Sequence, residues 1–208
     1  MITKFINSLF LPHHSWVFLI IICILLTGCP HPKIHRIQAN FSTPNKDTKQ
    51  IPLRVGLYLD PKLINFIKVP APKYSNKIDM GDALGKGAQY IVNKAFREVV
   101  SIYTTDPELI PKGLDALIIP EIDDIQESDE MNVYKKYGTV TVKIKWTIKD
   151  VNNKTIYVNT LTGEATYKHW PTVQREEGYT RAVEDQFTKA YIALTSTNWW
   201  QAVKKETN

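Results

Sequence analysis

The strictest constraint on the fold is an alternating pattern over residues 139–149. Apolar residues fill every second position: Val140, Val142, Ile144, Trp146 and Ile148. Successive side chains of a strand point to opposite faces, so the pattern predicts a strand with one buried and one solvent-facing side. A turn over residues 151–154 and a second strand over residues 155–167 complete an antiparallel hairpin.

Other segments predict further strands and two amphipathic helices. Strand patterns cover residues 53–60, 101–104 and 116–125, and Pro120 indicates an edge or a bulge in the last of these. Apolar stripes predict helices from Asp79 or Asp82 to about residue 100, and over residues 175–195. We therefore expect an α+β fold: a mostly antiparallel sheet of four to six strands with two helices packed on one face.

The N-terminal residues have the composition of an export signal. Residues 1–28 contain no Asp or Glu, one Lys, and an apolar run of 11 residues at positions 16–26. A membrane-spanning helix needs roughly 18 apolar residues, whereas the apolar region of a signal peptide has roughly 7–15. The alternative, a signal anchor, requires the run to extend back to Phe5 across Pro12 and two histidines.

Directly after this run, Leu26-Thr27-Gly28-Cys29 resembles the lipobox of bacterial lipoproteins. The resemblance implies a diacylglyceryl group on the Cys29 thiol, cleavage before Cys29, and acylation, as by palmitate, of the new amino terminus. Two acyl chains hold a protein stably on a bilayer, whereas one binds marginally. By similarity to enterobacterial sorting, Pro30 in place of Asp implies an outer-membrane lipoprotein that faces the periplasm.

On this interpretation the chain has three parts: a signal peptide (1–28), an acylated Pro-rich tether (29–52) and a single α+β domain (53–208). Four prolines and many polar residues in the tether predict an extended linker that buries little apolar surface. The other cysteine, Cys23, leaves with the signal peptide. We therefore expect neither thiol catalysis nor disulfides in the domain.

Composition and motifs argue against several kinds of site. The 26 basic and 21 acidic residues are dispersed, so we expect no nucleic-acid partner. Only His169 of the five histidines lies in the predicted domain, and prolines flank His31 and His35, so we expect no metal site. The glycines near Lys86 lack phosphate-loop spacing, and we expect no cofactor.

Two surfaces are candidates for partner binding. Lys143, Lys145 and Lys149 share the outward side of the alternating strand, where they would either be simply solvated or create a positive potential for an anionic glycan, lipid headgroups or an acidic partner. Trp199 and Trp200 either cap the core, rest on a membrane or enter a partner, since Trp is frequent at interface centres.

An acidic stretch at residues 121–130 holds six carboxylates. Its spacing does not match a calcium loop, and a solvated hairpin end or a docking surface for a basic partner would explain it. Paired carboxylates can also hydrolyse glycosidic bonds. Such an enzyme would need two of Asp123, Asp124 and Glu127 in one concave site.

We expect a protein that is not an enzyme: a non-catalytic, lipid-anchored, periplasm-facing accessory protein of a Gram-negative envelope transport or assembly system. Its partners would be the membrane, through Cys29, and an envelope protein. In element order and length, over residues 53–197, the chain resembles auxiliary lipoproteins of ABC-type export systems and the lipopolysaccharide-assembly lipoprotein. The alternative is a periplasmic cell-wall hydrolase that uses residues 121–130.

Overall fold

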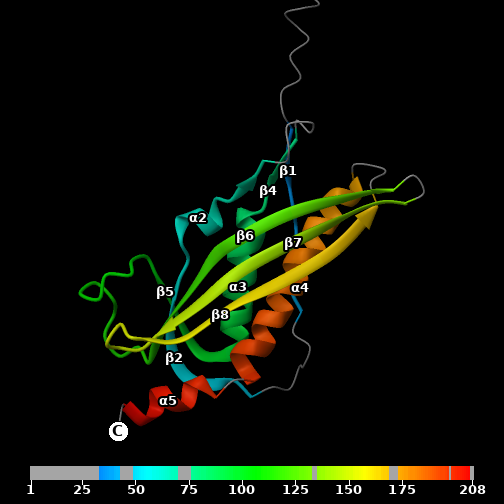
Figure 1. Cartoon of the computed structure of the whole chain (residues 1–208). Coiled ribbons are helices and arrows are strands. Elements are labelled where there is room, and N and C mark those ends of the chain that lie inside the picture. The colour runs from blue at the N-terminus through cyan, green and yellow to red at the C-terminus, as the bar shows by residue number, and fades with distance from the viewer. Residues whose placement is uncertain are drawn as a thin grey trace, which may run out of the picture. The chain divides into compact units, whose positions relative to one another are not determined.

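The predicted hairpin forms one side of a five-stranded sheet, with its second strand at the edge (Figure 1). The computed structural model of the chain describes residues 33–42, 49–69, 76–132, 135–168, 173–196 and 198–206. The described elements all belong to the unit Ile34–Asn208. The predicted signal peptide, Cys29 and His169 lie outside the described residues. No described helix has the length and apolar character needed to cross a bilayer.

The large sheet combines parallel and antiparallel pairs in the order β5-β2-β6-β7-β8. Antiparallel pairing joins β6 to β7 and β7 to β8, whereas β2 is parallel to both β5 and β6. The predicted α+β class is confirmed, but the sheet is more mixed than expected. Its strands are β2 (Ile51–Tyr58), β5 (Phe96–Ile102), β6 (Ala116–Asn132), β7 (Lys135–Lys149) and β8 (Thr155–Lys168).

The hairpin has the predicted alternation. The apolar residues of β7 from Val140 to Ile148 are fully buried on the core side. In the turn that follows, Asn153 has φ 62°, a left-handed conformation that Asn tolerates better than most residues. Pro120 lies in β6 beyond Ile118, the last residue paired with β2, where one side of the strand is open. The bulge lies further along, between Ile122 and Asp124.

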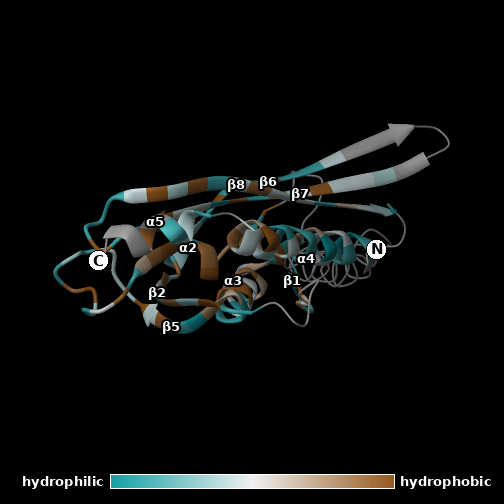
Figure 2. Ribbon diagram, turned by 90° about the horizontal axis from the view of Figure 1, so that it is seen from below, coloured by the Kyte–Doolittle hydropathy of each residue, from teal (hydrophilic) through white to brown (hydrophobic). Residues whose placement is uncertain are grey.

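Two long helices cover the core side of the long strands, as predicted (Figure 2). The first ends earlier than expected, because the chain turns at Phe96 (φ −117°, ψ 151°) directly into β5. The β-branched pair Val99 and Val100 favours a strand over a helix there. The helices are α2 (Pro61–Ile64), α3 (Gly81–Ala95), α4 (Val173–Ser196) and α5 (Trp199–Glu206).

The predicted tether is part of the fold over its described residues, so the expectation of an unpacked linker is wrong there. β1 (Ile34–Arg36) pairs with β4 (Lys77–Asp79), which pairs with β3 (Ile67–Lys68) to form a second, three-stranded sheet. Ile37 is buried, and the Phe41 ring packs edge-on against Phe187 at 5.4 Å. The four prolines of the tether leave residues 33–42 uninterrupted, and these apolar side chains reach the core.

A small second core lies on the other face of the large sheet. Leu117 and Ile119 of β6 contact Ile102 and Leu114 there, beside the loop between β5 and β6. Ile118 points into the main core. The start of β6 is therefore buried on both faces.

Candidate functional site

The predicted lysine ridge lies on the outer face of β7, but carboxylates of β6 lie beside it. Lys145 Nζ is 3.2 Å from Glu121 Oε2, and Lys143 is paired across the strands with Asp124. Lys149 Nζ donates to Asn153 Oδ1 at 2.9 Å. The ridge therefore has mixed charge and a weaker positive potential than the sequence predicts. That it binds a partner stays a prediction.

Trp199 caps the core, which is one of the alternatives that the sequence left open. Its side chain is buried, its ring lies 5.8 Å from Phe96 and 6.4 Å from Tyr157, and its Nε1 donates to Leu194 O at 3.2 Å. Trp200 is partly buried against the same core. Trp199 is thus not an exposed anchor for a partner.

The acidic stretch divides between the two faces of the sheet. Glu121 and Asp124 lie on the outer face beside the lysines, and Asp124 Oδ2 accepts from Gln126 Nε2 at 2.5 Å. The bulge at Asp123 inserts one residue and so reverses which later residues point inward. Glu127 therefore points to the core side. The side chains of residues 129 and 130 lie outside the description.

Glu127 is the acceptor at the centre of a buried polar cluster, defined here as Glu127, Tyr167, Arg175 and Tyr179. Arg175 binds its carboxylate with two nitrogens, Nε to Oε1 at 2.5 Å and Nη2 to Oε2. The Tyr167 hydroxyl donates to Oε1 and the Tyr179 hydroxyl to Oε2, the latter at 3.2 Å. The side chains of Glu127 and Arg175 are only 10% and 11% exposed.

Burial and the Glu127 charge together set the protonation of this cluster. Burial opposes the charge of Arg175, but the hydrogen bond and charge of Glu127 outweigh it and raise the Arg175 pKa above its ordinary value. Burial, followed by the Glu127 charge, raises the pKa of Tyr179. Tyr179 therefore remains a neutral hydrogen-bond donor over the physiological pH range.

Two glycines make room for the Tyr167 ring in this cluster. A Cβ on Gly178 of α4 would lie 2.6 Å from Tyr167 Cδ1, and a Cβ on Gly138 of β7 would clash with the hydroxyl end of the ring, at Cζ. The ring thus occupies a slot between the strand and the helix. Together with the ion pair, it fastens β6, β8 and α4 to one another.

Sequence reasoning missed this cluster, although one signal pointed to it. Arg175 lies one turn before Tyr179 on the apolar stripe of the predicted helix, and an arginine on a buried stripe needs an acidic partner. Glu127 could not be identified as that partner from the sequence, because only the bulge at Asp123 turns its side chain toward the core. Chemically, the two carboxylate oxygens of Glu127 are already bound by Arg175 and two tyrosines, an arrangement suited to holding structure together.

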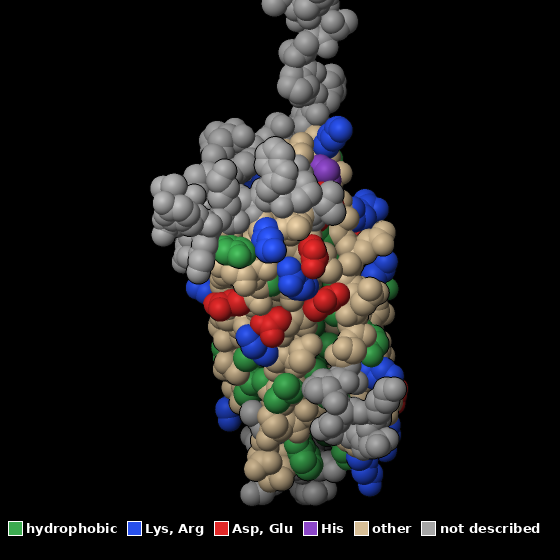
Figure 3. All heavy atoms as spheres, turned by 90° about the vertical axis from the view of Figure 1, so that its right-hand side faces the viewer, with side chains coloured by type: hydrophobic (Ala, Val, Ile, Leu, Met, Phe, Trp, Pro, Cys, Tyr) green, Lys and Arg blue, Asp and Glu red, His purple; other side chains and the backbone are tan. Residues whose placement is uncertain are grey.

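The exposed side of α4 also satisfies its own charges. The outer edge of β8 is bound by α4 side chains: Asp185 Oδ2 accepts from Glu164 N at 2.9 Å, Lys189 Nζ donates to Thr162 O at 3.0 Å, and Arg181 Nη2 donates to Thr166 O at 3.1 Å. Figure 3 shows acidic and basic side chains intermixed on this face. These contacts protect the strand edge from pairing with another chain.

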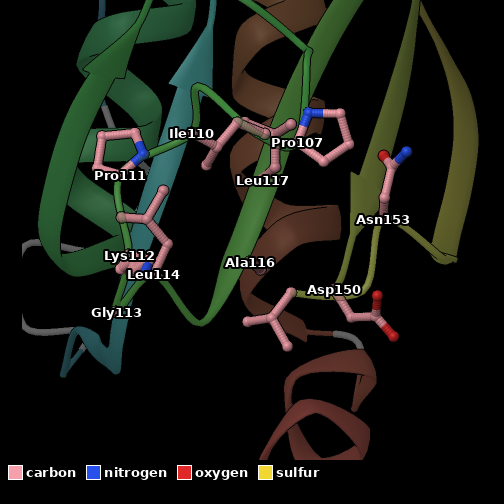
Figure 4. A pocket seen from close by; sticks show the side chains of 11 residues that line it. Pro107, Ile110, Pro111, Lys112, Gly113, Leu114, Ala116, Leu117, Asp150 and Asn153 are labelled. Carbon is pink, nitrogen blue, oxygen red and sulfur yellow. The ribbon is translucent and has the colours of Figure 1, made fainter.

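A pocket of about 250 Å³ lies between the β5–β6 loop and the β7–β8 turn (Figure 4). Asp150 holds the turn, because its Oδ1 accepts from the backbone nitrogens of Asn152 and Lys154 at 2.9 and 2.8 Å. Ile110, Leu114 and Leu117 are among the apolar residues that line the pocket.

Exposed apolar side chains belong to the same two segments. Tyr103 and Leu109 of the loop are 92% and 69% exposed, and Val151 of the turn is exposed as well. Val151 lines the pocket and Leu109 directly precedes the lining residue Ile110, and we call Leu109 and Val151 the pocket rim. Such a grouping of apolar side chains is suited to an apolar ligand or partner side chain. Among the described residues, no group of three or more His, Cys, Asp or Glu is arranged to hold a metal ion.

Comparison with known proteins identifies a similar fold. Neither a family model nor a curated protein matches the sequence. A crystal structure of a Xanthomonas campestris protein of the family DUF330 matches with a TM-score of 0.55 and 10% identity, over 84% of this chain and 99% of that one. A minor lipoprotein from Acinetobacter baumannii reaches 0.43 with 12% identity, over 71% and 94%. This chain therefore shares its fold with the Xanthomonas protein.

Proposed function

We propose that this chain is a non-catalytic, lipid-anchored accessory protein of a Gram-negative envelope transport or assembly system, held at the outer membrane and facing the periplasm. Support for the anchor comes from the lipobox Leu26-Thr27-Gly28-Cys29 behind a short apolar run. Support for the outer membrane comes from Pro30, by the same resemblance.

The observation that carries the non-catalytic part is the division of the acidic stretch. A glycosidase needs two carboxyl groups roughly 5–10 Å apart on either side of one bond. Asp124 and Glu127 instead lie on opposite faces of the sheet, and the Glu127 carboxylate is bound by Arg175. The geometry thus gives no support to a hydrolase that pairs Asp124 with Glu127.

The pocket rim is the surface that best fits a protein partner. Its aliphatic side chains are exposed beside a pocket that Ile110, Leu114 and Leu117 help to line. A side chain of an envelope protein that entered this pocket would cover the pocket and its rim together. The charged side chains on the exposed face of α4 are already paired with one another, as Arg181 is with Glu177 and Lys189 with Asp185. Fewer unpaired groups therefore remain there for a partner to bind.

Photo-crosslinking in intact cells tests this function. A photoreactive residue at Leu109 should crosslink to a protein of the envelope, whereas one at Ile192, an exposed apolar residue on α4, should give several-fold less product. Both variants should carry the lipid on Cys29. Equal or absent crosslinking at the two positions would contradict a partner at the pocket rim.

A further inference from the structure

The folded unit begins very close to the proposed lipid anchor. Because β1 starts at Ile34, only residues 30–33 separate the folded unit from Cys29. Five steps of extended chain span at most roughly 17 Å. If Cys29 carries lipid, as the proposed function states, the β1 end of the unit stays within about that distance of the headgroups.

The surface at this end is one side of the small sheet, here called the β1 face: Ile34, Arg36, Ile67, Val69 and Lys77. Ile34 is opposite Lys77, and Arg36 and Ile67 are both opposite Asp79, so these side chains share a side. Val69 directly follows β3 and continues toward Lys77. Ile34, Ile67 and Val69 are 60%, 44% and 65% exposed.

The chemistry of the β1 face matches the surface of a bilayer. Exposed aliphatic side chains alternate with the basic groups of Arg36 and Lys77, and the Asp79 carboxylate is paired with Arg36 at 3.0 Å. A hollow of about 450 Å³ beside it is lined by Arg36, Ile67, Asp79 and the Asp82–Lys86 ion pair, among others. Apolar side chains among basic ones are typical of segments that lie in the interface of an anionic membrane.

β1 is also held firmly in the folded unit, and this keeps the segment between Cys29 and Ile34 short. Ile37 N donates to Asp79 O at 3.1 Å, and the Asn40 amide donates to Glu184 Oε1 at 2.7 Å. His35 Nδ1 pairs with Glu176 Oε1. Fraying of β1 would break these contacts and expose Ile37. The segment that links Cys29 to the folded unit therefore does not lengthen easily.

We propose that the β1 face rests on the anionic phospholipid surface of the membrane that holds the lipid anchor. This inference depends on the proposed lipid anchor and adds an orientation to it. The small sheet and the β7–β8 turn lie at opposite ends of the unit (Figure 1). The pocket beside that turn consequently faces away from the membrane, where a periplasmic partner can reach it.

Fluorescence quenching in vesicles tests the orientation. The mature lipidated protein is purified from membranes as Val69→Cys or as the control Val158→Cys, reconstituted in phosphatidylglycerol-containing vesicles, and labelled with a thiol-reactive fluorophore. Both valines are exposed, and the mature chain has no cysteine besides Cys29. Nitroxide-headgroup lipid should quench the label at position 69 several-fold more strongly than the label at position 158.

The outcomes separate the two proposals. Equal quenching, or stronger quenching at position 158, overturns the orientation while the lipid anchor stands. Protein that does not associate with vesicles and carries no lipid overturns the anchor itself. Circular dichroism of both variants confirms that each has folded before quenching is compared.

Discussion

Two charge pairs lie on opposite faces of the β6–β7 hairpin and differ in depth. Glu127 and Arg175 on the core side are 10% and 11% exposed, whereas Glu121 and Lys145 on the outer side are 44% and 43% exposed. Removing one partner of a buried pair leaves an uncompensated charge, but water and salt screen an exposed pair. The same acidic stretch therefore contributes one structural ion pair and one weak surface pair. The bulge at Asp123 separates them, because it turns Glu127 toward the core while Glu121 stays on the outer face.

The largest effect should come from breaking the buried pair. We expect Arg175→Met to lower the free energy of unfolding by about 3–5 kcal/mol, because Glu127 would remain buried and charged. Urea unfolding monitored by circular dichroism measures the loss. The double variant Glu127→Gln/Arg175→Met keeps an acceptor for the two tyrosines and should regain a large part of the stability. A single variant within about 0.5 kcal/mol of the wild type would show that the pair is not buried.

Alkaline pH should weaken the same cluster by a smaller amount. Burial and the Glu127 charge raise the Tyr179 pKa above its ordinary value of 10.0, so the folded state holds this proton more tightly than the unfolded chain. The stability that results is complete below about pH 10 and is lost as the pH rises further. Unfolding free energies measured across that range should fall less steeply for Tyr179→Phe than for the wild type. Identical slopes would mean that Tyr179 is not buried beside a charge.

The outer pair should give the smallest effect. We expect Lys145→Ala to change the free energy of unfolding by less than about 1 kcal/mol, and any change to shrink further in high salt. Thermal unfolding at two salt concentrations checks this. A loss as large as that of Arg175→Met would mean that the outer pair is as important to stability as the buried pair.

The β7–β8 hairpin was predictable from the sequence because its signal, the alternation of apolar and polar residues, is local. Alternation along residues 139–149 fixes which side chains of β7 are buried. The parallel pairing of β2 and the attachment of β1 to β4 depend on segments distant in sequence, which no local period reveals. The apolar pattern of the helix continues past Phe96 in the sequence, although the backbone there already turns into a strand.

The candidate sites were less predictable for the same reason. Lys143 and Lys145 point outward as alternation requires, but their neighbours Asp124 and Glu121 follow from strand register. The inward direction of Glu127 depends on a single inserted residue, which reverses the face to which each later side chain of β6 points. The pocket rim combines a loop and a turn that are about 40 residues apart in sequence, so neither segment alone indicated a site.

Whether lipid on Cys29 holds the folded unit at a membrane is tested most directly by the intact mass of the protein isolated from native envelopes. We expect a chain that begins at Cys29 and carries the mass of a diacylglyceryl group, with or without a further acyl chain. A chain that retains residues 1–28 with an unmodified Cys29 thiol would contradict it.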